Sequence, residues 1–199
     1  EHADGIILTY ALYLPQTNQG KTPLIIWLHG GGEGGTDPTI PLIANKAYNY
    51  ASPEIQRYFN GAAVLVPQTP TRWMHGVTSS YTRGQEDDIY HKALMGLIQR
   101  FVEENPNIDQ NRIYVGGCSN GGYMSLKLLI ENPKYFAAGY ISALAYHNEF
   151  VSEEQLLKLK NIPIWFVHSQ DDPTTVVDKT ATPLYKRLKQ IGSKNVYYS

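Results

Sequence analysis

Short apolar runs alternate with helix-like periodicity along this chain. Residues 24–28 and 62–66 are continuous apolar runs, each followed within two residues by glycine or proline, as in strands buried on both faces of a parallel sheet. Further strands are predicted at residues 6–14, 113–115, 138–144, 162–167 and 195–198. Helices are predicted at residues 87–104, 124–130 and 184–191, where apolar residues recur at helical spacing. This order predicts an α/β fold with a mostly parallel central sheet and helices on both faces.

Composition, net charge and cysteine count exclude several classes of protein for this chain. The 199 residues fit a single domain over 1–199, and with 42% hydrophobic and 18% charged residues they can bury a substantial core. Seventeen basic and eighteen acidic residues give a net charge of −1, which provides no long-range attraction to nucleic acid or an anionic membrane. The most apolar stretch, residues 137–145, is far shorter than the roughly 20 residues of a membrane span. A single cysteine excludes an intrachain disulfide and a thiolate zinc site.

A glycine-flanked serine follows the strand predicted at residues 113–115. Gly117, Ser119 and Gly121 match the pattern G-x-S-x-G between a strand and a helix. Such a turn strains the backbone of the serine and exposes its hydroxyl, while the flanking glycines leave room for neighbouring backbone. Ser119 is therefore the candidate nucleophile. A glycine-rich turn capped by serine is the alternative, and the adjacent Cys118 is expected to be a small buried apolar residue.

An earlier predicted strand runs into the glycine cluster of residues 29–35. Acyl transfer produces a tetrahedral oxyanion, which needs two backbone N–H donors fixed in advance. The N–H of Asn120, directly after the candidate nucleophile, is one such donor, and Gly31 or Gly32 would supply the other. A phosphate-binding loop is the competing interpretation, but the chain lacks G-x-x-x-x-G-K-[ST]. His29 is expected to orient this loop or to belong to the core.

The motifs HGGGE at residues 29–33 and GCSNGGYM at residues 117–124 resemble, in this order and separation, those of the α/β-hydrolase superfamily. The resemblance covers nearly the whole chain. It is strongest to the secreted esterase and prolyl-oligopeptidase-like branch, which includes feruloyl esterases and polyhydroxybutyrate-depolymerase-like enzymes. It implies an α/β-hydrolase fold, serine hydrolase chemistry without a metal or organic cofactor, and a secreted protein of which this chain would be one domain.

Two adjacent carboxylates follow the strand predicted at residues 162–167. The sequence HSQDDP at residues 168–173 resembles the family's His-Gly-x-x-Asp-Pro, with Ser169 in place of the glycine. That resemblance selects Asp172 as the acid, which would orient the base and stabilise its imidazolium. Asp171 is the fallback, and an aspartate that only caps a turn is the alternative without a catalytic role.

The base is missing from the expected place. In this fold the chain order is Ser, Asp, His, yet no histidine follows His168 and the chain stops at Ser199, where the last predicted strand has just begun. His75 and His147 lie in loops after strands and are the candidates for a substitute base. We expect instead that the chain is truncated and that its continuation carries the histidine. Residues 1–199 alone are then expected to be weakly active or inactive.

Three tryptophans have different expected roles. Trp73 lies in residues 68–85, a long segment expected to form a rim of the pocket, where an exposed indole would stack on a sugar or an aromatic acyl group. Packing within the loop is the alternative for Trp73. Trp27 and Trp165 lie in predicted strands and are expected in the core.

These features predict a serine hydrolase of carboxylic esters. Ser119 would attack the carbonyl, and Asp172 would orient the histidine. The family resemblance implies short acyl esters or plant-polysaccharide esters such as acetyl or feruloyl groups as substrates. The balanced charge and the short apolar stretches predict no nucleic-acid or membrane partner. A serine peptidase of the same fold and a binding domain that has lost its catalytic histidine are the alternatives.

Overall fold

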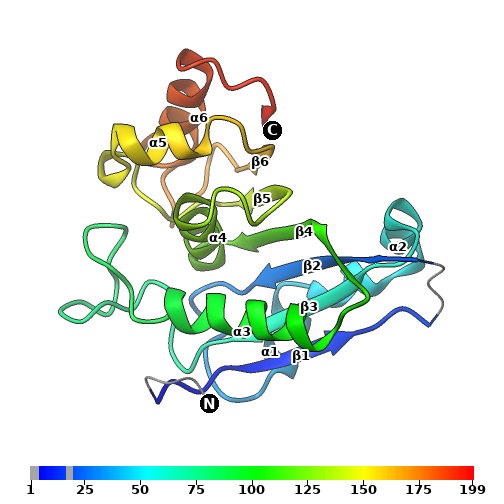
Figure 1. The fold of residues 1–199 in the computed structure, drawn as a ribbon. Helices are drawn as coiled ribbons and strands as arrows, with labels where there is room; N and C mark the ends of the chain where they lie inside the picture. The colour runs from blue at the N-terminus through cyan, green and yellow to red at the C-terminus, as the bar shows by residue number, and fades with distance from the viewer. Residues whose placement is uncertain (1–4, 17–19) are drawn as a thin grey trace.

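The computed structural model of this chain describes residues 5–16 and 20–199. Within these residues, seven strands form one sheet in the order β1-β3-β2-β4-β5-β6-β7 (Figure 1). The strands are β1 (Thr9–Tyr13), β2 (Thr22–Leu28), β3 (Ala63–Gln68), β4 (Ile108–Cys118), β5 (Ala138–Ser142), β6 (Ile164–Val167) and β7 (Val196–Tyr198). Only β1 runs antiparallel to its neighbour, so the predicted mostly parallel sheet is confirmed.

Helices cover both faces of the sheet, as predicted. They are α1 (Thr39–Ala44), η1 (Ala47–Ala51), α2 (Pro53–Phe59), α3 (His91–Glu104), α4 (Asn120–Glu131), η2 (Asn148–Phe150), α5 (Glu153–Leu159), η3 (Val177–Lys179) and α6 (Ala181–Gln190). Side chains of β2 alternate between two hydrophobic clusters. Leu24 and Ile26 pack in the cluster that includes α3, α4, α5 and α6, whereas Ile25 and Trp27 pack with α1, η1 and α2. None of the helices in the described ranges is long and apolar enough to cross a membrane.

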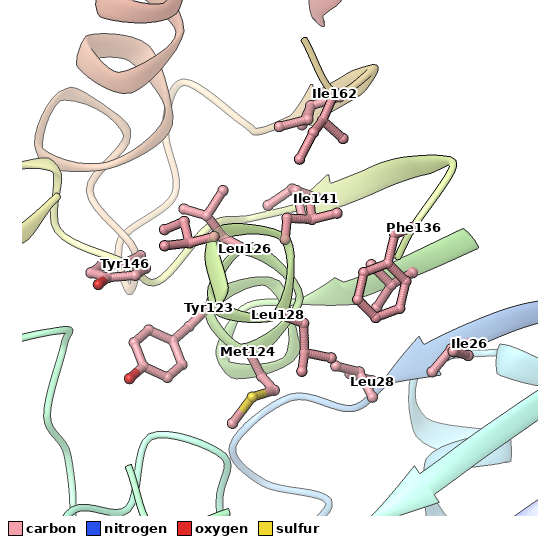
Figure 2. Packing of buried hydrophobic residues seen from close by; sticks show 14 of the residues in the cluster. Ile26, Leu28, Tyr123, Met124, Leu126, Leu128, Phe136, Ile141, Tyr146 and Ile162 are labelled. Carbon is pink, nitrogen blue, oxygen red and sulfur yellow. The ribbon is translucent and has the colours of Figure 1, made fainter. Parts of the chain in front are cut away.

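Helix α4 lies at the centre of the larger cluster. Every residue from its first, Asn120, to Ile130 is buried, because the helix packs between the sheet and neighbouring helices. Figure 2 shows Tyr123, Met124 and Leu126 projecting from α4 in different directions into the surrounding core. A helix buried all round is held rigidly, and so is the residue that precedes it.

Several element boundaries differ from the prediction. The helix predicted from residue 87 begins only at His91, and Asp87 and Asp88 precede it: Asp88 Oδ1 accepts hydrogen bonds from the N–H groups of Tyr90 (3.0 Å) and His91 (2.7 Å). Helices α1, α2 and α5 were not predicted, because six or seven residues give too little periodicity. A capping box between Ser152 and Gln155 is the signal that could have revealed α5.

The tryptophans of β2 and β6 lie in one cross-strand row of the sheet. Trp27 is buried as expected, but Trp165 is 49% exposed, and its assignment to the core is wrong. Trp165 pairs with Tyr140 and Tyr197 in the register. These rings line an apolar cavity of about 390 Å³ on the face where α1, η1 and α2 pack near β2, β3 and β4. Trp165 is therefore exposed because no described helix covers its part of that face.

Candidate active site

Ser119 occupies a single-residue elbow between β4 and α4. Its backbone lies at φ 55° and ψ −109°, a region that non-glycine residues rarely adopt and that strained functional positions often use. The N–H of Ser119 donates to the carbonyl of Ser142 on β5 at 2.9 Å, which fixes the elbow to the neighbouring strand. The predicted strand, turn and helix around Ser119 are thus all present.

Cys118 precedes the elbow and is partly buried. Burial raises the pKa of the Cys118 thiol, despite an opposing hydrogen bond with Ser142. The thiol therefore stays protonated at neutral pH and is a poor nucleophile, in line with a packing role.

Neighbouring backbone comes so close to the elbow that both of its flanking residues must be glycine. A Cβ atom on Gly117 would stand 2.5 Å from the carbonyl carbon of Gly121, and one on Gly121 would stand 2.0 Å from the carbonyl oxygen of Leu28. Real Cβ atoms essentially never come so close to backbone atoms. The glycines thus allow α4 to begin directly against the end of β2.

Replacing Gly121 by alanine is therefore expected to lower the free energy of unfolding by about 3 kcal/mol or more, because backbone must move to admit the methyl group. Gly32→Ala is the matched control: a Cβ there meets nothing within 4 Å, so its effect should stay within about 0.5 kcal/mol. Urea denaturation of both variants measures the difference. Equal stabilities would mean that the approach of α4 to β2 is not tight.

The glycine loop at residues 29–35 is held by a buried histidine. His29 Nδ1 donates to the carbonyl of Gly30 at 2.6 Å, and His29 Nε2 accepts from the N–H of Thr69 at 3.2 Å. Burial lowers the pKa of His29 to about 4, although the bond to Gly30 acts in the opposite direction. The ring is therefore neutral, with both nitrogens engaged, and it orients the loop as expected.

Further bonds fix this loop to the end of β3. The side-chain amide of Gln68 donates to the carbonyl of Glu33 at 2.9 Å, and the N–H of Gly35 donates to the carbonyl of Thr69 at 2.7 Å. The carbonyl of Thr71 lies where a Cβ on Gly34 would stand, so the two segments are in direct contact. The loop is thus preorganised before any substrate binds.

The glycine loop and the elbow meet at Gly31 and Asn120. A Cβ on Gly31 would lie 3.8 Å from Cβ of Asn120, whereas one on Gly32 would face open space. The side chain of Asn120 also accepts a hydrogen bond from the N–H of Met74 at 3.0 Å, which joins the loop of residues 69–90 to α4. The structure therefore brings together the predicted oxyanion segments, with Gly31 nearer to Asn120.

Trp73 is completely buried, and the expectation of an exposed indole is wrong. Its ring centroid lies 5.0 Å from that of His29, beneath the glycine loop. The neighbouring Met74 is equally buried, because this part of residues 69–90 folds back onto the core. Trp73 presents no face to a ligand here, and it supports the loop through His29.

The two candidate acids have different surroundings. Asp172 accepts hydrogen bonds from the N–H groups of Thr174 (2.8 Å) and Thr175 (2.9 Å) and from the Thr175 hydroxyl (2.7 Å). Burial alone would raise the pKa of Asp172, but these bonds and the nearby His168 hold it below its ordinary value. Asp171 is exposed and accepts a hydrogen bond from Ser169. Asp172 is thus the carboxylate fixed in place and charged at neutral pH.

No histidine in the described part of the chain forms a hydrogen bond with Ser119. His168 is buried beneath the Asp172 turn, where its Nε2 donates to the carbonyl of Thr175 at 2.7 Å and its Nδ1 is buried without a hydrogen-bond partner among the described residues, so neither nitrogen is bonded to Ser119. His75 is engaged with the hydroxyl of Thr71. His147 contacts Glu149 and stacks on Phe150. His2 lies outside the described residues.

The described ranges also contain no cluster of His, Cys, Asp and Glu that could hold a metal ion.

Known protein sequences are similar to this chain over most of its length. The sequence model of the Phospholipase/Carboxylesterase family matches residues 14–198. A poly(3-hydroxybutyrate) depolymerase of Ralstonia pickettii is 31% identical over 137 residues, which cover 65% of this chain and 26% of that protein. S-formylglutathione hydrolase of Bos taurus is 24% identical over 155 residues, which cover 69% of this chain and 51% of that protein.

Solved structures share the fold. A thermostable esterase is 32% identical and superposes with a TM-score of 0.83, covering 96% of this chain and 50% of its own. An acylaminoacyl peptidase of Pyrococcus horikoshii, at 20% identity and a TM-score of 0.65, covers all of this chain and 35% of its own, and shows similarity of fold alone. This chain therefore spans about half or less of the length of these relatives. With the family model matching nearly its whole length, the chain belongs to the phospholipase/carboxylesterase family and has the α/β-hydrolase fold.

Proposed function

We propose that the protein containing this chain hydrolyses carboxylic esters with Ser119 as nucleophile. The observation that carries the proposal is the strained elbow of Ser119 beside a preorganised glycine loop. The Ser119 hydroxyl oxygen attacks the carbonyl carbon of the ester while a base takes its proton. The resulting oxyanion collapses and expels the alcohol, which receives that proton. Water then cleaves the acyl-enzyme by the same two steps and releases the acid.

The oxyanion would be stabilised by backbone N–H groups. Asn120 stands at the first position of α4, where N–H groups are free of helical partners and the helix dipole favours negative charge. The second donor is Gly31 or Gly32, and the contact between Gly31 and Asn120 favours Gly31. Hydrogen bonds from His29, Gln68 and Thr69 keep the loop in place, so little reorganisation is needed during the reaction.

The base in this proposal is a histidine outside residues 1–199. Asp172 supports it, because this carboxylate is charged and fixed at the turn after β6 while the described histidines are engaged elsewhere. The longer relatives leave room for such a residue. Asp172 would accept a hydrogen bond from the imidazole, fix its tautomer and stabilise the imidazolium.

We further propose short acyl esters or plant-polysaccharide esters, such as acetyl or feruloyl esters, as the substrates of a secreted protein. The resemblance to a thermostable esterase and to a poly(3-hydroxybutyrate) depolymerase supports ester chemistry. Peptide hydrolysis has less support, since the peptidase likeness is one of fold alone.

The experiment compares the natural protein with residues 1–199 alone on p-nitrophenyl acetate and butyrate. We expect hydrolysis by the natural protein and a rate at least about 10³-fold lower for residues 1–199, because a triad member is missing. Circular dichroism checks that both are folded. Equal rates would place the base within residues 1–199, and no hydrolysis by either protein would reject the esterase proposal.

A further inference from the structure

We propose that a positively charged pocket beside the Asp172 turn binds an anionic group, a carboxylate or a phosphate, of the ester substrate. This inference rests on the proposed esterase function and specifies its substrate class. The pocket, named here the cationic pocket, has a volume of about 170 Å³. Segments from three parts of the chain line it: residues 81–83, residues 145–147 and residues 174–180. Each segment contributes one basic side chain, Arg83, His147 and Lys179 respectively.

The two permanently charged side chains of this pocket, Arg83 and Lys179, lack acidic partners among the described residues. Neither Arg83 nor Lys179 forms an ion pair with any residue that the structure describes. A further cation, Arg72, lies 5.7 Å from the ring of Tyr81, and Arg83 lies 5.3 Å from the same ring. Gathering like charges around one aromatic ring is unfavourable unless an anion or solvent screens them. A bound carboxylate or phosphate would compensate these charges.

Two acidic residues lie next to the pocket without lining it. Glu149 lies 3.4 Å from Nδ1 of His147, and Asp178 adjoins Lys179; both line a neighbouring hollow that His147 and Lys179 also line. Asp172 lies behind the threonines and is occupied by their hydrogen bonds. The pocket itself therefore presents cations and threonine side chains.

Packing fixes the loop that carries Arg83. Arg83 has a φ of 52°, and the following Gly84 has a φ of 97° and lies so close to the ring of Tyr146 that a Cβ would stand 1.9 Å from it. The carbonyl of Arg83 accepts a hydrogen bond from the N–H of His147 at 3.2 Å. Tyr81 restrains the guanidinium further. Arg83 is thus a positioned cation that remains open to solvent and to a ligand.

The pocket is linked through its lining residues to Asp172 and to the elbow of Ser119. Thr175, which is buried in its wall, donates its hydroxyl to Asp172 Oδ2 at 2.7 Å. On another side, the chain reaches Ala145 of the pocket three residues after Ser142, whose carbonyl accepts from the N–H of Ser119. In this proposal the ester carbonyl is held at Ser119, and the anionic group of the same substrate binds in the cationic pocket.

The test uses the natural protein and two matched ester pairs. p-Nitrophenyl butyrate and p-nitrophenyl hemisuccinate differ by a carboxylate on the acyl side, whereas phenyl acetate and 4-acetoxybenzoate differ by one on the alcohol side. In at least one pair, we expect Arg83→Gln and Lys179→Gln each to raise KM for the anionic ester about 5-fold to 10-fold, with KM for the neutral ester and kcat unchanged. Arg83→Lys should restore most of the affinity.

The control variant is Lys189→Gln on the exposed side of α6, which should leave all four substrates unaffected. Calorimetry with succinate and inorganic phosphate tests the pocket without hydrolysis, and binding should weaken in Arg83→Gln. If neither variant changes KM for either anionic ester and neither anion binds more weakly to Arg83→Gln, the cationic pocket is not a subsite. Absence of hydrolysis of the neutral esters would instead overturn the esterase proposal.

Discussion

Replacing Ser119 by alanine is expected to lower kcat/KM of the natural protein for p-nitrophenyl butyrate by about 10⁴-fold or more. The reaction then loses the oxygen that forms the acyl-enzyme, and only the oxyanion loop and substrate binding remain. Because the hydroxyl of Ser119 is not among the hydrogen bonds that hold the elbow, the fold should be retained. Stopped-flow or steady-state release of p-nitrophenolate measures the loss, with thermal unfolding as a check of folding.

Cys118→Ser is the control for this experiment, since it changes the adjacent side chain and leaves Ser119 in place. The half-buried thiol has a raised pKa, so its exchange should change the rate by less than about 5-fold. If Ser119→Ala kept its activity while Cys118→Ser lost it, the nucleophile would be the cysteine.

The position of the elbow could be predicted from sequence because it depends on local signals. The strands β2 and β3 of the same sheet are buried on both faces, so each is a continuous apolar run that can be recognised in the sequence. Gly117 and Gly121 stand where neighbouring backbone comes so close that only glycine fits. Their spacing around Ser119 therefore marks the position of the turn in the sequence. Strand, turn and helix are short-range features, which explains why they were predicted in the correct order.

The exposure of the tryptophans could not be predicted, because it depends on elements distant in the chain. Trp73 is buried by a loop that folds back onto His29, about forty residues earlier, and is held there by the bond from Met74 to Asn120. Trp165 has the alternation of an ordinary strand residue, yet its part of the face is open because the described helices on that side lie near β2, β3 and β4. Periodicity indicates which residues share a face, but it does not indicate what covers that face.

The partners of the charged residues near the site also could not be predicted from the sequence, because they depend on residues distant in the chain. Asp87, expected to open α3, pairs instead with Lys127 of α4, and Asp88 accepts from the hydroxyl of Tyr123 at 3.2 Å. These contacts join residues 69–90 to α4, the helix that follows Ser119. The separation of Asp172 from Asp171 likewise needed the hydrogen bonds of the turn, since adjacent carboxylates are equivalent in the sequence pattern.

Asp172→Asn in the natural protein is expected to lower kcat/KM for p-nitrophenyl butyrate by about 10³-fold to 10⁴-fold. The amide oxygen at residue 172 can still accept from the N–H groups of Thr174 and Thr175, and the Thr175 hydroxyl can rotate to accept from the amide nitrogen. The turn should therefore stay folded. In the proposed mechanism, what is lost is the negative charge that holds the imidazole in the correct tautomer and stabilises it when protonated.

Asp171→Asn removes the same charge from the adjacent exposed position, where the only described bond to its side chain comes from Ser169. Because that carboxylate is fixed by fewer contacts, we expect less than about a 3-fold change in kcat/KM. Thermal unfolding of both variants separates catalysis from stability. A large loss in Asp171→Asn with little loss in Asp172→Asn would reverse the assignment of the acid. Comparable rates in both variants and in the unsubstituted protein would mean that the turn after β6 supplies no catalytic acid. The hydrogen bonds that Asp172 accepts from Thr174 and Thr175 would then serve only to shape the turn.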